Sequence, residues 1–152
     1  MNSYAELLYY IESLGEADVF VNTVTKTGDA DLDTYKANIF PILDVFIGGG
    51  SFPSNALIRY NVSLTCVDLR NINKEIVNDK FSENDNEIDN HTETIMVLNR
   101  IWLLMKRDFA ENNITASETP TFEKITLEGS NLYDGWQLSF DVDVPNTTID
   151  LC

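Results

Sequence analysis

Residues 56–66 read ALIRYNVSLTC, and an apolar side chain occupies every second position of this stretch. Successive side chains of a β-strand point to opposite faces of the sheet, so a period of two predicts a strand with one buried and one solvated face. The apolar residues 39–47 come before it, and the segment GGGSFPSN lies between the two at 48–55. We therefore predict an antiparallel hairpin in which Gly48 to Asn55 form a long, flexible tip.

A second hairpin is predicted at the end of the chain. Residues 121–127 and 136–144 have the composition of strands and flank the turn-rich segment 128–135. In the last strand, the alternating residues that predict a core face are Trp136, Leu138, Phe140, Val142 and Val144. Residues 19–25 are rich in β-branched side chains and predict one further strand.

Two segments have the spacing of amphipathic helices. In the first, Ser3 and Glu6 have the spacing of a capping box, and Gly15 is placed to cap the C-terminus. The second runs from about Asn86 to Glu111. Its apolar stripe is too broad for a two-stranded coiled coil and predicts a helix that lies across a sheet; it includes Ile88, His91, Ile95, Leu98, Trp102, Met105 and Phe109.

The predicted order α-β-ββ-α-ββ describes a single α+β domain over residues 1–152. We expect an antiparallel sheet of two hairpins plus one strand, with a short N-terminal helix and one long helix packed on it. A chain of 152 residues, of which 43% are hydrophobic, is long enough to bury one core but hardly two. No repeat or linker suggests a second domain.

The charge is the most unusual property of the composition. Ten Lys and Arg residues stand against 25 Asp and Glu residues, which gives a net charge of −15 and a pI near 4.1. Such a surface would repel nucleic-acid phosphates and anionic membranes. The simplest interpretation of this charge is solubility alone. The charge also fits a wall past which polyanions slide, a face for a basic partner, or a DNA mimic.

Targeting signals are not predicted. The first 14 residues lack a basic region and carry Glu6 and Glu12 among their apolar side chains, unlike a signal peptide. No apolar run approaches the roughly 20 residues of a membrane span. We therefore expect a protein that is made and folded in the cytosol, without a membrane partner.

The sequence contains no complete metal-binding motif. Asp29, Asp31 and Asp33 begin like a calcium-binding loop, but Thr34 and Phe40 stand where that loop needs Gly and a bidentate Glu. The lone histidine and two distant cysteines do not supply the ligands of a zinc site. We expect no bound metal and no cofactor.

The sequence also predicts no enzyme. Nucleophilic catalysis would require an activating base, for which His91 is the only histidine, and Cys66 lies within the apolar set of a strand. The glycines at 48–50 join two strands and are followed by no Lys, unlike a phosphate-binding loop. We expect His91 and Cys66 to be structural, and Trp102 and Trp136 to be core aromatics.

Three local features accompany the element order. They are residues 39–68 with their Gly-rich segment, a helix that ends in WLLMKR at 102–107, and an ending from Gly135-Trp136 to Pro145-Asn146. Across nearly the whole chain the arrangement resembles the tail-terminator and tail-completion family of bacteriophage neck proteins. This resemblance implies a structural virion protein that forms a closed ring, usually hexameric and in related neck proteins twelvefold.

The resemblance also implies a place and partners. Such a ring caps the tail tube and joins it to the head connector, with genomic DNA passing through its centre. The implied partners are other copies of the chain, the portal or connector protein and the tail-tube protein. The implied location is the neck or tail of the virion, after assembly in the bacterial host cytoplasm. An acidic lumen would keep DNA from sticking during its passage.

Cyclic rings require two complementary surfaces on each subunit. We expect these surfaces to include the two hairpin loops and the C-terminal tail. The candidate contact residues are Gly48, Gly49, Gly50, Phe52, Asn131, Tyr133, Asn146 and Leu151. Two other functions remain open: an acidic inhibitor that mimics DNA in the basic cleft of a nuclease or repressor, and a chaperone or scaffold for tail assembly. For each segment, an ordinary surface loop is the alternative.

Overall fold

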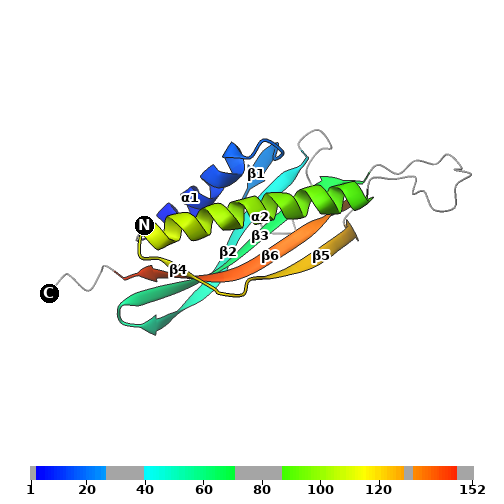
Figure 1. The fold of residues 1–152 in the computed structure, drawn as a ribbon. Helices are drawn as coiled ribbons and strands as arrows, with labels where there is room; N and C mark the ends of the chain where they lie inside the picture. Colours follow the sequence, from blue (N-terminus) through cyan, green and yellow to red (C-terminus); the bar gives the residue numbers. More distant parts are fainter. Residues whose placement is uncertain (1–2, 27–39, 71–86, 129–131, 147–152) are drawn as a thin grey trace, which may run out of the picture.

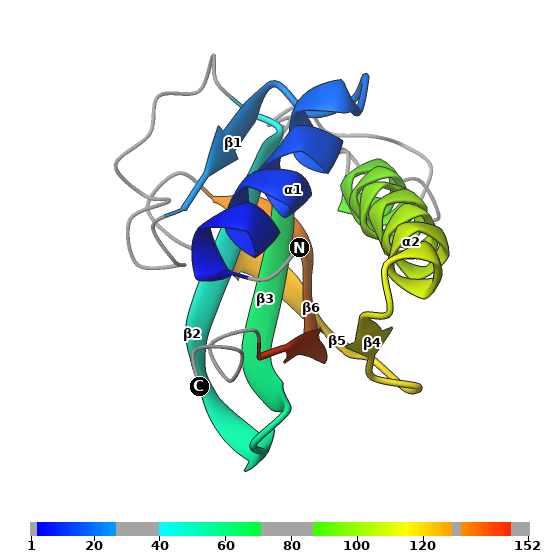
Figure 2. The ribbon, with the colours of Figure 1, turned by 90° about the vertical axis from the view of Figure 1, so that its left-hand side faces the viewer.

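The computed structural model of the protein describes residues 3–26, 40–70, 87–128 and 132–146. Its elements, in order, are α1 (Tyr4–Ala17), β1 (Thr23–Thr25), β2 (Ile42–Ser54), β3 (Leu57–Leu69), α2 (Glu87–Glu111), β4 (Thr115–Ala116), β5 (Thr121–Glu128) and β6 (Tyr133–Pro145). The strands form one sheet in the order β1-β2-β3-β6-β4, and β5 also pairs with β6. Both helices lie on the same side of this sheet (Figures 1 and 2). The predicted α+β architecture is confirmed, with the short β4 as an addition.

The sheet is mixed, because its first strand runs parallel to its neighbour. Thr23 to Thr25 pair in parallel with Ile42 to Asp44, whereas β2, β3, β6, β4 and β5 pair antiparallel. The expectation of a wholly antiparallel sheet was therefore wrong at this position. Parallel neighbours need a connection of about a dozen residues or more, and the interval between Thr25 and Ile42 is long enough. β1 is also shorter than predicted, since Val19 is 99% exposed and lies outside it.

The first hairpin has a much tighter tip than predicted. The glycines at 48–50 belong to β2, which continues to Ser54, and only Asn55 and Ala56 form the turn. Irregular pairing around Gly48 and between Ser51 and Ser54 accommodates the extra residues in β2. A Cβ atom on Gly50 would lie 2.0 Å from the carbonyl oxygen of Arg59. Glycine thus permits close strand contact here, and the predicted flexible tip of 48–55 was wrong.

The helix ends follow local chemistry with one exception. As predicted, the Ser3 hydroxyl caps α1 by accepting a hydrogen bond from the Glu6 amide at 3.2 Å. Gly15 does not end this helix, which continues to Ala17. A Cβ atom on Gly15 would lie 2.5 Å from the Leu43 side chain, so this glycine lets α1 pack closely on β2. At the end of α2, the Ile114 amide donates a hydrogen bond to the Phe109 carbonyl at 3.0 Å.

The main core lies between the helices and the sheet. It contains the alternating residues of β3 and β6 together with the α2 stripe, as predicted: Val62, Leu64, Cys66, Leu138, Phe140, Val142, Val144, Val97, Leu98, Ile101, Met105 and Phe109. Ile88 was expected in the stripe but is 65% exposed. A smaller cluster on the opposite face contains Phe40, Ile42, Val67, Ile125 and Tyr133.

Polar contacts attach the first turns of α2 to the sheet. Arg70 binds Asp134 through two hydrogen bonds of 2.7 and 2.8 Å and approaches Glu87 at 3.2 Å. The Nε2 atom of the buried His91 lies 2.8 Å from the Ile125 carbonyl oxygen, and the Trp136 indole donates to the His91 carbonyl. His91 is therefore buried and hydrogen-bonded between α2 and the sheet, as a structural imidazole would be.

Asp68, near the end of β3, provides a test of charge burial. Burial of this carboxyl, together with the nearby Glu93, raises its pKa, although the Leu69 amide donates to it. A raised folded pKa means that ionisation at neutral pH opposes folding, and this penalty disappears as pH falls through that pKa. Asp68→Asn keeps the acceptor for Leu69. We expect it to stabilise the protein at pH 7 by on the order of 0.5 kcal/mol in urea unfolding, with the gain over wild type disappearing in acid. A gain in stability that is equal at all pH values would show that the buried charge of Asp68 is not its cause.

Candidate interaction site

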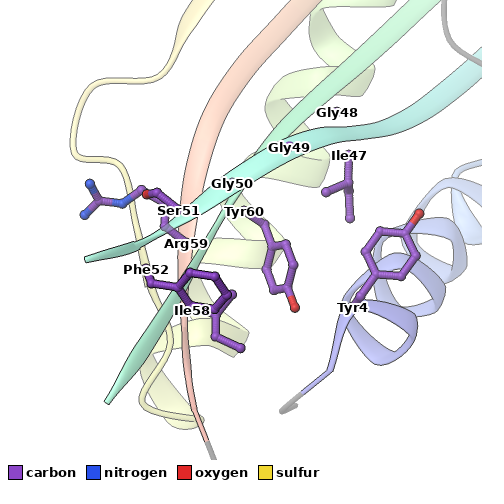
Figure 3. A pocket seen from close by; sticks show the side chains of 10 residues that line it. All are labelled: Tyr4, Ile47, Gly48, Gly49, Gly50, Ser51, Phe52, Ile58, Arg59 and Tyr60. Atoms are coloured by element: carbon purple, nitrogen blue, oxygen red, sulfur yellow. The ribbon is translucent and has the colours of Figure 1, made fainter. Parts of the chain in front are cut away.

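The hairpin of β2 and β3 extends past the helices at one end of the molecule (Figure 2). A groove of about 350 Å³ lies there between the hairpin and the start of α1; we call it the tip groove. Its lining residues are Tyr4, Ile47, Gly48, Gly49, Gly50, Ser51, Phe52, Ile58, Arg59 and Tyr60 (Figure 3). The groove is open, largely apolar and built from three elements, so it offers a surface for another molecule.

Aromatic side chains dominate the tip groove. Phe52 is 77% exposed and Tyr4 is 48% exposed, and the rings of Tyr4 and Tyr60 lie 6.2 Å apart. In Figure 3, Phe52 and Ile58 lie close together, on the side of the hairpin that Tyr60 also occupies. Large aromatics that are left exposed together are typical of binding surfaces, because burying one against a partner removes much apolar area from water.

Two of the longer strands have open edges among the described residues. β1 covers β2 only at Ile42 to Asp44, so the rest of β2 has no described strand on that side. β5, at the opposite side of the sheet, pairs with β6 alone. An open strand edge carries unpaired backbone donors and acceptors and is a ready template for another strand. The part of the sheet that the structure describes thus has one such edge on each side.

The predicted contact residues fall into three groups. Gly48, Gly49, Gly50 and Phe52 all line the tip groove. Asn146 fastens the end of β6 to the hairpin turn, since its amide donates to the Ala56 carbonyl at 2.8 Å. Asn131 and Leu151 lie outside the described residues.

The prediction for Tyr133 was wrong. It was expected in a surface loop, but it is 4% exposed within β6 and stacks on Phe40 at 6.2 Å. Gly135 also belongs to this strand, and its missing side chain lets β6 begin earlier than the turn-like composition of 128–135 suggests. A buried Tyr133 cannot supply a contact to a neighbour.

Other members of the tip groove were missed by the sequence prediction. Tyr4 follows the predicted helix cap Ser3, and Tyr60 is one of the alternating apolar residues of 56–66; the sequence does not reveal that both line one groove at the hairpin. The alternation in residues 56–66 begins before the part of β3 that the helices bury. A strand longer than the helices that cover it leaves apolar side chains exposed at its end, and this was the signal in the sequence that could have indicated the groove.

Comparison with known protein families finds none whose model matches this chain, and comparison with curated proteins finds no matching sequence.

Most of the positive charge in the described part of the chain is neutralised within the fold. Arg59 pairs with Asp143, Arg70 with Asp134, Arg100 with Asp18 and Arg107 with Asp108, each at 2.7–3.0 Å. Lys26 lies 3.1 Å from Glu12. A surface that binds phosphates needs cations that are available to them. The arginines are engaged elsewhere, so the fold offers DNA little to hold.

Catalytic and metal chemistry find no support in the described residues. Cys66 is fully buried in β3, and burial raises the pKa of its thiol, which disfavours the nucleophilic thiolate. No three described His, Cys, Asp or Glu side chains are grouped so that they could hold a metal ion. The calcium-like residues Asp29, Asp31 and Asp33 lie outside the described ranges. Neither described helix is long and apolar enough to cross a membrane.

Proposed function

We propose that this protein is a structural virion subunit that forms a ring in a phage neck or tail terminator. The ring would cap the tail and join it to the head connector, and DNA would pass through it without specific binding. The observation that supports this function best is the pair of open strand edges on opposite sides of one sheet, together with the exposed aromatic tip groove. The chain would contribute no catalysis.

Strand directions favour a head-to-tail contact. Each neighbour along β2, β3, β6 and β5 runs antiparallel to the one before, so β2 and β5 run in opposite directions. If two subunits keep the same orientation, β5 of one meets β2 of the next as an antiparallel pair. Contacts of this heterologous kind generate a ring when the rotation closes. Because β1 occupies Ile42 to Asp44, the neighbouring strand would meet β2 farther towards its tip, with a stagger like that of barrel strands.

The charge supports a passage for DNA. On the sheet face turned away from the helices, Asn61 lies opposite Asp141, and both are exposed. Arg59 and Asp143 pair on the same face and leave no net charge. With a net charge of −15 per chain, a ring of several copies would repel the phosphate backbone throughout its lumen. A lumen lined by available Lys and Arg side chains would contradict this role.

The oligomeric state tests the proposal directly. Native mass spectrometry of the purified full chain, combined with electron microscopy of negatively stained particles, is expected to show closed rings. Six copies are expected, and twelve would also agree. A protein that stays monomeric alone and with tail-tube and connector proteins would contradict the proposal. A stable complex with a basic nuclease or repressor would instead favour a DNA mimic.

Phe52→Asp is expected to weaken ring formation at least tenfold. The substitution places a carboxylate on the most exposed aromatic of the tip groove, where a neighbour would have to desolvate it. The measurement is the fraction of rings against concentration, from light scattering after size-exclusion chromatography. Val19→Asp is the matched control, because it adds the same charge at an apolar residue that is 99% exposed and outside the tip groove. Equal loss in both variants would show a charge effect without a specific contact.

A further inference from the structure

A second groove follows the boundary between α2 and β5. It consists of two adjoining hollows of about 200 and 470 Å³ that share Ile95, and we call their union the α2–β5 groove. The residues that matter for its chemistry are Trp102, Pro120, Phe122, Lys124 and Trp136. A cavity of about 150 Å³ with apolar walls accepts a benzene-sized group, so this groove has room for apolar side chains.

Two lysines lie at the α2–β5 groove, whose lining also includes Glu87. Lys124 lines it, and the Lys106 ammonium lies 5.7 Å from the centre of the Trp102 ring at its side. Neither lysine makes an ion pair with a described carboxylate, unlike Lys26 and the arginines. An apolar floor with two lysines complements a segment that combines apolar side chains with a carboxylate.

We propose that residues 147–152 of a second copy of the chain bind in the α2–β5 groove. Their sequence is TTIDLC, in which Ile149 and Leu151 flank Asp150. In an extended segment, Ile149 and Leu151 point to one side and Asp150 to the other. The two apolar side chains would enter the groove, and Asp150 would face Lys124 at its rim. This proposal rests on the proposed ring and names the contact that joins its subunits.

The length of the C-terminal segment determines whether it can bind the groove of its own chain or only that of a neighbour. Leu151 is five residues beyond Asn146, so an extended chain carries it at most about 18 Å from there. Leu138, on the groove floor, lies eight residues back along β6, or about 27 Å at the rise of a strand. Residues 147–152 therefore do not reach along the groove of their own subunit. A neighbour that presents the hairpin end of its sheet can supply them.

A charge exchange tests the contact in the full chain. Lys124→Glu and Asp150→Lys are each expected to weaken ring formation several-fold, and the double variant is expected to restore it. Lys124 is exposed, so its replacement leaves the core intact. Leu151→Asp is expected to weaken ring formation at least tenfold, whereas Thr147→Asp, in the same segment, has little effect. The proposal would be overturned if the losses of the two single variants added up in the double variant, or if Leu151→Asp formed rings as stable as wild type. Either result would leave the proposed ring function standing.

Fluorescence separates this contact from the ring. Trp102 and Trp136 are the only tryptophans, and both line the α2–β5 groove. A synthetic peptide of residues 144–152, with Cys152→Ser, is added to the monomeric Phe52→Asp variant of the full chain. We expect saturable change in tryptophan emission with this peptide and none with a scrambled peptide of the same composition. No change with the native order would overturn the proposal, whether or not rings form.

Discussion

Asp134→Ala is expected to destabilise the protein by about 3–5 kcal/mol, the usual cost of breaking a buried ion pair. The Asp134 side chain is fully buried and that of Arg70 is 6% exposed. Removing the carboxylate takes away two short hydrogen bonds and leaves the guanidinium without its bidentate acceptor. Because this pair attaches the residue that follows β3 to β6, beside the start of α2, we expect a lower midpoint in urea unfolding followed by circular dichroism.

Asp143→Ala is the matched comparison for this prediction. Arg59 and Asp143 also form a two-bond pair between β3 and β6, at 2.7 and 2.9 Å, but the Arg59 side chain is 40% exposed. Exposed pairs contribute about 1 kcal/mol or less because water screens them. Equal losses in the two variants would show that burial does not set the importance of Asp134. Replacing Arg70 and Asp134 together by apolar residues should recover part of the loss.

Gly135→Ala is expected to destabilise the protein by at least about 2 kcal/mol, the range for overpacking a tight interior. A Cβ atom at this position would lie 1.9 Å from the carbonyl oxygen of Cys66 and 2.8 Å from the Cα atom of Val67. Both obstacles are backbone atoms of β3, so no side-chain rotation relieves the clash. The strands must move apart at the centre of the sheet, where Gly135 also pairs with Ile125.

Gly49→Ala serves as its control. The nearest atom to a Cβ on Gly49 is the Asn61 amide nitrogen at 3.9 Å, an ordinary contact distance. We expect thermal unfolding of Gly49→Ala to match wild type within about 0.5 kcal/mol, as for most surface substitutions. A similar loss at both glycines would mean that chain flexibility, and not the approach of β6 to β3, explains the effect at Gly135.

Periodicity in the sequence was enough to predict most of the fold. The α2 stripe and the alternation in β3 and β6 depend on which side chains face the core, and this is a local property of each element. The capping hydroxyl of Ser3 was likewise predictable from residues three positions apart. Those signals explain why the α+β class and the order of the main elements are confirmed.

The errors occur where contacts between distant segments decide the outcome. Gly50 and Gly135 were assigned to loops because glycine is common in turns, but both belong to strands that approach β3 closely. The parallel pairing of β1 with β2 is a property of topology, which local composition does not encode. The turn-like composition of residues 128–135 also led to the prediction that Tyr133 is exposed, whereas it is buried.

The candidate site was predictable only in part. Phe52 and the glycines at 48–50 were predicted as contact residues and are exposed in the structure, but Tyr4, which lines the same groove, comes from a distant part of the sequence. The α2–β5 groove was not predicted, because Trp102 and Trp136 were assigned to the core. Both are partly buried and pack against the core while also lining the groove. A side chain with two such faces cannot be recognised from spacing alone.

The pairing of β3 with β6 has a mechanical consequence. The two strands are matched from Leu57–Pro145 to Leu69–Tyr133, and the Asn146 amide adds a bond at the hairpin turn. Antiparallel hydrogen bonds lie perpendicular to the strands. Tension applied along the hairpin would therefore load these bonds together in shear, instead of opening them one after another. A domain built in this way would transmit force from the hairpin tip into the rest of the sheet with little deformation.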